Sequence, residues 1–258
     1  MILIDTHTHL YLPNFKDDIE QVIQNAVEQH VKKMLLPNID TESVRPMLEL
    51  CNIFPDQCHP MIGLHPTSVG KDYREKLSVL ESLFATEKFI AIGETGMDAY
   101  WDKTFIHEQE DSFIRHLEWA RKFDLPVVIH SRETMDKTIE IIQKHSGGNL
   151  RGVFHAFSGS TGQAEKIVNL GFKLGIGGVV TYKNSGLSPV IEAADPGDIV
   201  LETDSPYLTP VPHRGKRNES ANLLFIARSI ANMKGVHVEE IADITSKNAS
   251  ELFNLNIE

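Results

Sequence analysis

The chain has 258 residues, of which 41% are hydrophobic and 24% charged, a balance typical of a globular protein with a sizeable core. Its net charge of −11 argues against a generic nucleic-acid coat or a binder of anionic membranes, but not against a nucleic-acid enzyme whose carboxylates hold metals. No apolar run approaches the roughly 18 residues of a membrane span, and the cysteines Cys51 and Cys58 form neither a disulfide framework nor a CxxC motif. Because Asp5 interrupts the first apolar run early, we expect a cytoplasmic protein without a signal peptide or a membrane partner.

Apolar strand-like runs alternate along the chain with amphipathic helix-like segments. The strands are expected at residues 2–9, 33–38, 59–64, 89–94, 126–130, 152–155, 173–177 and 199–204. The helices are expected at residues 17–30, 41–54, 73–85, 105–123, 134–144, 162–170, 220–233 and 238–253. This rhythm predicts an α/β fold, a (β/α)₈ TIM barrel formed by a single domain over residues 1–258. An open doubly wound sheet is the alternative, but no GxGxxG follows the first strand.

The first predicted strand ends in two histidines, His7 and His9, with one residue between them. Side chains two apart on a strand project from the same face, so both imidazoles point the same way. Imidazole pairs of this kind suit a divalent metal, although HxH alone is a short pattern that also occurs at surfaces.

Other predicted strands end in the same kinds of residue. His65, Glu94, His130 and His155 follow or close the third to sixth strands, and Glu202 and Asp204 close the eighth. In a barrel, these carboxyl ends meet at one rim, where catalytic groups lie. A single buried histidine is often a packing residue, but this whole set predicts a metal centre at the C-terminal ends of the strands.

The number of candidate ligands exceeds what one catalytic zinc needs, which is three protein ligands and an open position. Two metals that share a carboxylate fit better, and Glu94 is the natural bridge. Asp204 can orient a water and take its proton, and the spacing leaves open whether Asp204 is a ligand, a base or both. Imidazoles favour zinc or manganese, whereas a nuclease can use magnesium, so the metal stays unidentified.

A basic loop follows the eighth predicted strand. Arg214, Lys216 and Arg217 lie within four residues of one another, shortly after Asp204. Arginine offers a planar fork that matches phosphate oxygens, so the loop is placed to hold phosphate beside the metals. The alternative is a solvated basic loop with no ligand.

Several ordered blocks resemble the TatD-like metal-dependent DNases of the amidohydrolase superfamily. The blocks are Asp5-Thr6-His7-Thr8-His9-Leu10, Ile62-Gly63-Leu64-His65-Pro66, Ile92-Gly93-Glu94-Thr95-Gly96-Met97-Asp98, Pro126-Val127-Val128-Ile129-His130-Ser131-Arg132, His155-Ala156-Phe157-Ser158-Gly159, Glu202-Thr203-Asp204-Ser205-Pro206-Tyr207-Leu208 and Arg214-Gly215-Lys216-Arg217-Asn218. They extend over nearly the whole chain, so the resemblance is specific.

The resemblance implies a distorted TIM barrel with two divalent ions. It implies that His7, His9 and Asp204 hold one ion, that His130 and His155 hold the other, and that Glu94 bridges them. It also implies that His65, Glu202 and the loop with Arg214, Lys216 and Arg217 surround the substrate phosphate.

The expected function is hydrolysis of phosphodiester bonds by a metal-activated water, and the resemblance implies 3′–5′ exonuclease activity on DNA. The expected partner is a DNA or oligonucleotide substrate, with Asp204 and Glu94 as catalytic residues, and we expect a monomer without an obligate protein partner. The alternatives are a binuclear hydrolase of another bond, such as an acyl-tRNA ester, a lactone or a small amide, and a metal-binding scaffold without activity.

Overall fold

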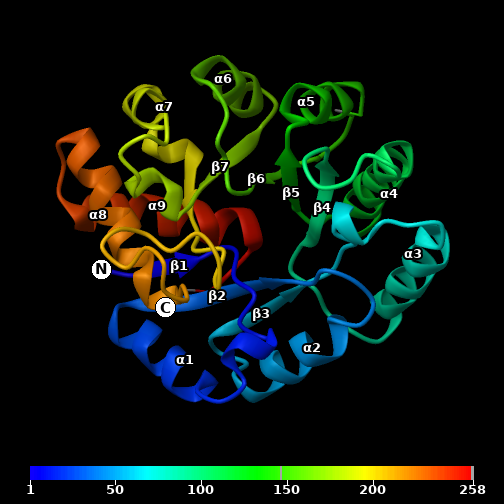
Figure 1. Cartoon of the computed structure of the whole chain (residues 1–258), viewed down its shortest axis with the longest axis horizontal. Helices are drawn as coiled ribbons and strands as arrows, with labels where there is room; N and C mark the ends of the chain where they lie inside the picture. The colour runs from blue at the N-terminus through cyan, green and yellow to red at the C-terminus, as the bar shows by residue number, and fades with distance from the viewer. Residues whose placement is uncertain (146, 257–258) are drawn as a thin grey trace.

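The computed structural model describes residues 1–145 and 147–256, in which parallel strands form a ring surrounded by helices (Figure 1). The strands are β1 (Leu3–Asp5), β2 (Val31–Pro37), β3 (Cys58–Met61), β4 (Ile92–Asp98), β5 (Val127–Arg132), β6 (Gly152–Phe154), β7 (Phe172–Ile176) and β8 (Ile199–Leu201). Most of their side chains are buried, because helices cover one face of the sheet and the barrel interior fills the other.

The helices alternate with the strands and turn an apolar face toward them. They are α1 (Ile19–Glu28), α2 (Val44–Ile53), α3 (Tyr73–Ser82), α4 (Ile106–Phe123), α5 (Met135–Lys144), α6 (Thr161–Asn169), α7 (Ser188–Ala193), α8 (Leu223–Lys234) and α9 (Val238–Phe253). In α1, for example, Val22, Ile23 and Ala26 are buried on one face. Within residues 1–145 and 147–256, no helix combines the length and hydrophobicity needed to cross a bilayer.

Hydrogen-bonded ladders divide the ring into two parallel sheets, β1-β2-β3 and β4-β5-β6-β7-β8. The sheets meet at two seams. At one seam, a single bridge joins Ile62 to Ile92; at the other, Thr8 is bridged to Ser205 and the Thr6 backbone N–H donates to the Leu201 carbonyl at 3.0 Å. The fold is therefore a distorted (β/α)₈ barrel whose ladder is interrupted on either side of β1-β2-β3.

The interior of the barrel is packed with apolar side chains and is closed at one end by α9. Most strands contribute to this layer, and the interior cluster contains Ile4, Leu35, Met61, Ala91, Val128, Val153 and Val200 together with Ala249, Leu252 and Phe253 of α9. Two polar side chains of α9 reach the beginnings of strands: Ser246 Oγ donates to the Ile2 carbonyl and Asn248 Nδ2 to the Ile199 carbonyl, each at 2.8 Å. Because α9 covers the amino ends of the strands, the carboxyl ends face the opposite side, the one available to a ligand.

The sequence prediction of eight strands in a (β/α)₈ barrel is confirmed, with errors in strand ends and one missed helix. The strands expected at residues 2–9 and 199–204 end at Asp5 and Leu201, so His7, His9, Glu202 and Asp204 lie just beyond strands rather than on them. The strand expected at residues 89–94 is Ile92–Asp98 in the structure, so it continues past Glu94. The short helix α7 was not predicted, because its six residues give too little periodicity to detect. The expectation of one domain over residues 1–258 stays a prediction, and residues 146, 257 and 258 of that span lie outside the described part of the chain.

One buried histidine of α4 maintains the fold. His116 is completely buried, its Nε2 accepts the backbone N–H of Leu64 at 2.9 Å, and its Nδ1–H donates to the Ser112 carbonyl at 2.6 Å. Burial lowers the pKa of His116 from its ordinary value of 6.5 to about 4. The imidazole is therefore neutral in the native protein and fixes the backbone directly before His65.

Replacing His116 with Gln, which retains an acceptor but does not titrate, is expected to weaken the acid dependence of stability. The pKa of His116 is lower in the folded than in the unfolded chain, so the unfolded chain binds a proton more readily. The free energy of unfolding should therefore fall by about 2 kcal/mol between pH 7 and pH 5 because of this residue. Urea unfolding at the two pH values measures this loss, which should be about 2 kcal/mol smaller in the variant.

His107, which is exposed on the same helix, provides the matched control. The His107→Gln variant should retain the wild-type pH dependence. If the His116→Gln variant retained it as well, the buried imidazole would not be the group responsible.

Candidate metal centre

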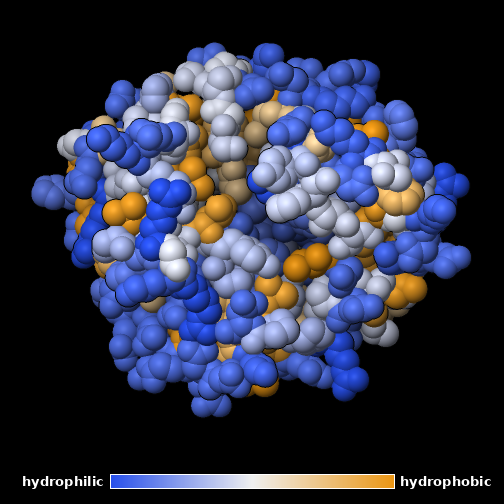
Figure 2. All heavy atoms as spheres, viewed as in Figure 1, coloured by the Kyte–Doolittle hydropathy of each residue, from blue (hydrophilic) through white to orange (hydrophobic). Residues whose placement is uncertain are grey.

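A cavity of about 670 Å³ opens at the carboxyl ends of the strands, within the range of volumes of small-ligand sites. Its lining includes His9, Glu94, His130, His155 and Asp204, which lie on, or shortly after, five different strands. The face shown in Figure 2 is hollowed near its centre, and both hydrophilic and hydrophobic residues surround the hollow. The barrel thus brings together side chains that are far apart in the sequence.

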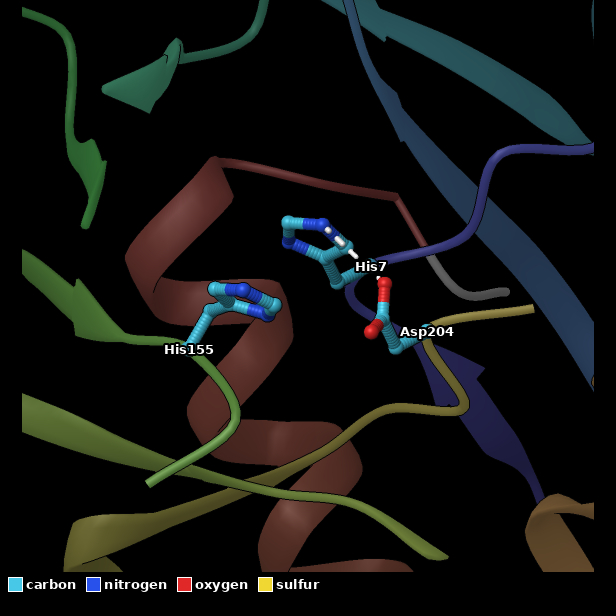
Figure 3. Close-up of side chains that lie close together, drawn as sticks. All are labelled: His7, His155 and Asp204. Carbon is cyan, nitrogen blue, oxygen red and sulfur yellow. Dashed lines mark ion pairs between the residues drawn. The ribbon is translucent and has the colours of Figure 1, made fainter. Parts of the chain in front are cut away.

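Glu94 is the carboxylate on which the site centres, and only 3% of its side chain is exposed. Its Oε2 lies 3.1 Å from His7 Nε2 and 3.7 Å from His9 Nε2. The two nitrogens are 3.2 Å apart, and Asp204 Oδ1 lies 3.8 Å from that of His7 and 3.5 Å from that of His9. In Figure 3, His7 faces Asp204, while the ring of His155 stacks on that of His7 with centroids 3.8 Å apart.

The second oxygen of Glu94 faces a different set of histidines. Oε1 lies 2.8 Å from His130 Nδ1, 3.1 Å from His155 Nε2 and 3.3 Å from His65 Nε2. The carboxylate therefore divides its two oxygens between two groups of imidazoles on opposite sides of the site.

The spacing of these atoms suits a divalent cation. Ligand atoms that bind zinc tetrahedrally at about 2.0–2.1 Å lie about 3.3 Å from one another. The measured separations among the ligand atoms of His7, His9, Glu94 and Asp204 run from 3.1 to 3.8 Å. The ligand atoms of His65, Glu94 and His130 form a further compact group, all within 4.8 Å of one another. The residues present fit a divalent metal by both donor type and distance.

The electrostatics of the Oε2 side favours the protonation states that metal ligands need. Burial alone would raise the pKa of Glu94, but the imidazoles of His155, His65 and His7 outweigh it and hold that pKa well below its usual range. Burial and the nearby His155 lower the pKa of His7. Glu94 is therefore ionised and His7 neutral near pH 7, the forms in which both donate lone pairs to a cation.

Asp98 orients the imidazole of His130 from the side away from Glu94. Its Oδ2 lies 2.9 Å from His130 Nε2, while Nδ1 of the same ring faces Glu94. Burial opposes a charge on His130, but hydrogen bonding to Asp98 and Glu94 prevails and raises its pKa. A carboxylate behind a histidine fixes the ring and increases its basicity.

Glu202 has the corresponding position behind His155. It is completely buried, its Oε1 lies 3.3 Å from His155 Nδ1, and the same oxygen accepts the backbone N–H of Ala156 at 2.5 Å. Burial opposes a charge on His155, but Glu94 and Glu202 prevail and raise its pKa well above the usual value. Glu202 is not among the residues that line the cavity. The structure places it against His155, a metal-ligand candidate, and its predicted position around the substrate phosphate stays a prediction.

Tyr11 fixes the tautomer of His9. The tyrosine hydroxyl donates to the Pro37 carbonyl at 2.6 Å and lies 3.0 Å from His9 Nδ1. Because its one proton is directed to Pro37, the hydroxyl accepts a hydrogen bond from Nδ1–H of His9. Nε2 of His9 is then unprotonated and directed at the other ligand atoms.

The basic loop lies apart from the cavity lining. The guanidinium of Arg217 forms two hydrogen bonds with the carboxylate of Asp18, at 2.8 and 2.6 Å, and a third with Glu219 at 2.8 Å. Arg214 lies 4.3 Å above the ring of Tyr182. Neither these two arginines nor Lys216 lines the cavity. That the three cations bind substrate stays a prediction, and Arg217 already has carboxylate partners.

The sequence analysis missed several residues that the structure places at the site, among them Tyr11, Asp98, Trp101 and Arg132. Two of them carry a signal that could have been used. Arg132 comes two residues after His130 on β5, and Asp98 comes four after Glu94 on β4. Even spacing keeps side chains on one face of a strand. Tyr11 and Trp101 lie beyond β1 and β4 and show no such pattern.

The chain is similar to proteins of one family over nearly its whole length. The model of the TatD related DNase family matches residues 4–254. YabD of Bacillus subtilis, an uncharacterised metal-dependent hydrolase, is 34% identical over 99% of this chain and 100% of its own. The crystal structure of YjjV, a TatD homologue of Escherichia coli, superposes with a TM-score of 0.90 at 31% identity and covers 98% of both chains. A lactonase of Listeria monocytogenes, at 12% identity and a TM-score of 0.69, shares the fold alone and covers 97% of this chain and 94% of its own.

Enlarging Gly175 is expected to weaken metal binding by displacing Glu202. A Cβ at this position would lie 2.4 Å from Glu202 Oε2 and 3.0 Å from His155 Cα, so Gly175→Ala forces the two residues to move. Loss of a carboxylate that orients a metal-binding histidine costs about 10- to 100-fold in metal affinity. Titration calorimetry of metal-free protein with Zn²⁺ and Mn²⁺ measures this change.

Gly162→Ala in α6 is the matched control, because no atom lies within 4 Å of its added Cβ. Its metal affinity should equal that of the wild type. An unchanged affinity in Gly175→Ala would mean that Glu202 does not support His155 as a ligand.

Proposed function

Since this chain belongs to the TatD related DNase family, whose relatives are metal-dependent hydrolases, we propose that it hydrolyses phosphodiester bonds of DNA with two divalent ions. The proposed activity is that of a 3′–5′ exonuclease, which cleaves nucleotides from the ends of DNA or oligonucleotides. The ions are Mg²⁺, Zn²⁺ or Mn²⁺, and the enzyme acts as a cytoplasmic monomer.

This proposal rests on the observation that the two carboxylate oxygens of Glu94 face two different groups of histidines. One oxygen faces His7 and His9, and the other faces His130 and His155, at distances from 2.8 to 3.7 Å. A single ion would use only one side of this arrangement, whereas a bridging carboxylate uses both. Divalent ions at such a pair of sites supply Lewis acidity and lower the pKa of water near the scissile phosphorus.

Asp204 is the proposed general base. Burial opposes ionisation of Asp204, but the imidazole of His9, 3.5 Å away, and those of His155 and His7 prevail and lower its pKa, so the carboxylate is ionised. In the proposed reaction, water adds to phosphorus, Asp204 takes a proton from this water, and the bond from phosphorus to the leaving oxygen breaks. The leaving oxygen takes a proton from solvent and departs as an alcohol, and Asp204 returns its proton to solvent. Glu94, His7, His9, His130 and His155 hold the ions in place.

Asp204→Asn is expected to lower kcat/KM on single-stranded oligonucleotides by about 100- to 10,000-fold, the usual contribution of a general base. Oligonucleotides labelled at the 5′ or the 3′ end, incubated with each divalent ion in turn, report the bond cleaved, the direction and the metal together. Asp243→Asn changes an exposed carboxylate of α9 and should leave turnover as it is. Metal-loaded wild type that is inert toward every oligonucleotide would contradict the proposed function.

Hydrolysis of another ester or an amide is the second candidate function. The observation in its favour is that, among the described residues that line the cavity, Arg132 is the one arginine or lysine. A neutral ester or amide requires no cation beside the metals, so this lining would also suit it.

Arg132→Gln is expected to distinguish the two candidates. If the substrate is a phosphodiester, the ratio of its turnover to that of a neutral carboxylic ester should fall about 10- to 100-fold, because a charged hydrogen bond to phosphate is lost. Arg214→Gln, whose side chain stacks on Tyr182, should change this ratio much less. An equal fall in Arg214→Gln would show that the basic loop reaches the substrate.

A further inference from the structure

An exposed ledge of Tyr100, Trp101 and Arg132 borders the cavity. Tyr100 is 49% exposed and Trp101 is 69% exposed, although most large apolar side chains of this chain are buried. The Arg132 guanidinium lies 3.7 Å above the ring of Tyr100 and 5.4 Å from the centroid of Trp101. Trp101 and Arg132 line the same cavity as Glu94 and Asp204.

The ledge is fixed to the metal centre through a shared carboxylate. Asp98 Oδ1 accepts the backbone N–H of Tyr100 at 2.8 Å and of Trp101 at 3.3 Å, while its Oδ2 lies 2.9 Å from His130 Nε2. Asp98 on β4 is also the register partner of Arg132 on β5. One carboxylate therefore sets the position of the aromatic pair and of a histidine that faces Glu94.

The composition of the ledge selects a class of ligand. Planar aromatic and guanidinium groups stack on nucleobases, because every base has a π-face. In the described part of the chain, no carboxylate lies within ion-pair distance of Arg132, so its charge is available to a phosphate. A small aliphatic ester would make no use of an indole that is 69% exposed.

We propose that the ledge stacks an unpaired nucleobase at a single-stranded DNA end, with Arg132 contacting the neighbouring backbone phosphate. The inference rests on the proposed phosphodiesterase function and specifies its substrate. A base inside a duplex is paired and stacked on both faces, whereas an unpaired base has a free face for Trp101. The enzyme therefore prefers unpaired to blunt ends.

Two single-stranded substrates that differ only in the terminal residue test this contact. The wild type should cleave a terminal thymidine in a single-stranded oligonucleotide with a kcat/KM about 5- to 150-fold above that for an abasic residue at the same position, the range for one stacked base. In Trp101→Ala, this ratio should approach one, and in Trp101→Phe most of it should remain. Ile53→Ala alters a side chain that is 67% exposed on α2 and is not part of the cavity lining, so it should retain the wild-type ratio.

Fluorescence provides a readout that is independent of turnover. The chain has two tryptophans, and Trp119 is 1% exposed, so an oligonucleotide quenches mainly Trp101. A dT₁₂ with hydrolysis-resistant phosphorothioate linkages should quench wild-type emission, and Trp101→Phe should abolish most of this change. Circular dichroism and metal content show whether each variant is folded and loaded.

The outcomes separate the two proposals. If the wild type cleaves oligonucleotides but Trp101→Ala lowers turnover of both substrates equally, or if blunt ends are preferred, the ledge is not a base-stacking site. If the wild type cleaves no phosphodiester but quenching still depends on Trp101, the proposed function fails while the binding site stands. Loss of the base preference together with loss of quenching supports both.

Discussion

The mutual neutralisation of buried carboxylates and imidazoles around Glu94 is the interaction on which the structure depends. The side chain of Glu94 is only 3% exposed, and burial of an ionised carboxylate destabilises the folded state unless compensating groups surround it. The imidazoles of His7 after β1, His65 after β3, His130 on β5 and His155 after β6 provide this environment, and the barrel must bring these four segments to the same level. The barrel meets that requirement because α9 occupies the opposite end, which leaves the carboxyl ends open to the cavity.

The candidate ligands could be predicted from sequence because strand geometry is local. The two-residue period of a strand predicted that His7 and His9 share a face, and the rule that catalytic groups lie at the carboxyl ends of barrel strands predicted the other ligands. In the structure both histidines lie just after β1, on either side of the Thr8–Ser205 bridge. The same period extends to Asp98, four residues after Glu94, but the predicted strand ended at Glu94. An incorrect strand boundary therefore concealed the carboxylate that orients His130.

Residues whose roles depend on distant partners could not be predicted in the same way. Arg217 has the charge of a phosphate-binding residue, yet it hydrogen-bonds Asp18, 199 positions earlier. Glu202 and Asp204 are two apart and belong to the same motif, but Glu202 is completely buried behind His155 while Asp204 lines the cavity. Side-chain burial at this level of detail depends on neighbouring strands, and the sequence near these residues does not contain that information.

The seam between β1 and the end of β8 has a consequence for biosynthesis. Asp204 N–H donates to the His7 carbonyl at 2.9 Å, so two residues separated by 197 positions must meet before the first group of ligands exists. A chain that emerges from the ribosome from its amino end presents His7 and His9 long before β8 and α9 are made. Until the segment after β8 is made, the growing chain has His7, His9 and Glu94 but lacks Asp204, the fourth ligand of that group. Tight metal uptake becomes a late event, which follows synthesis of Asp204 and closure of the ring.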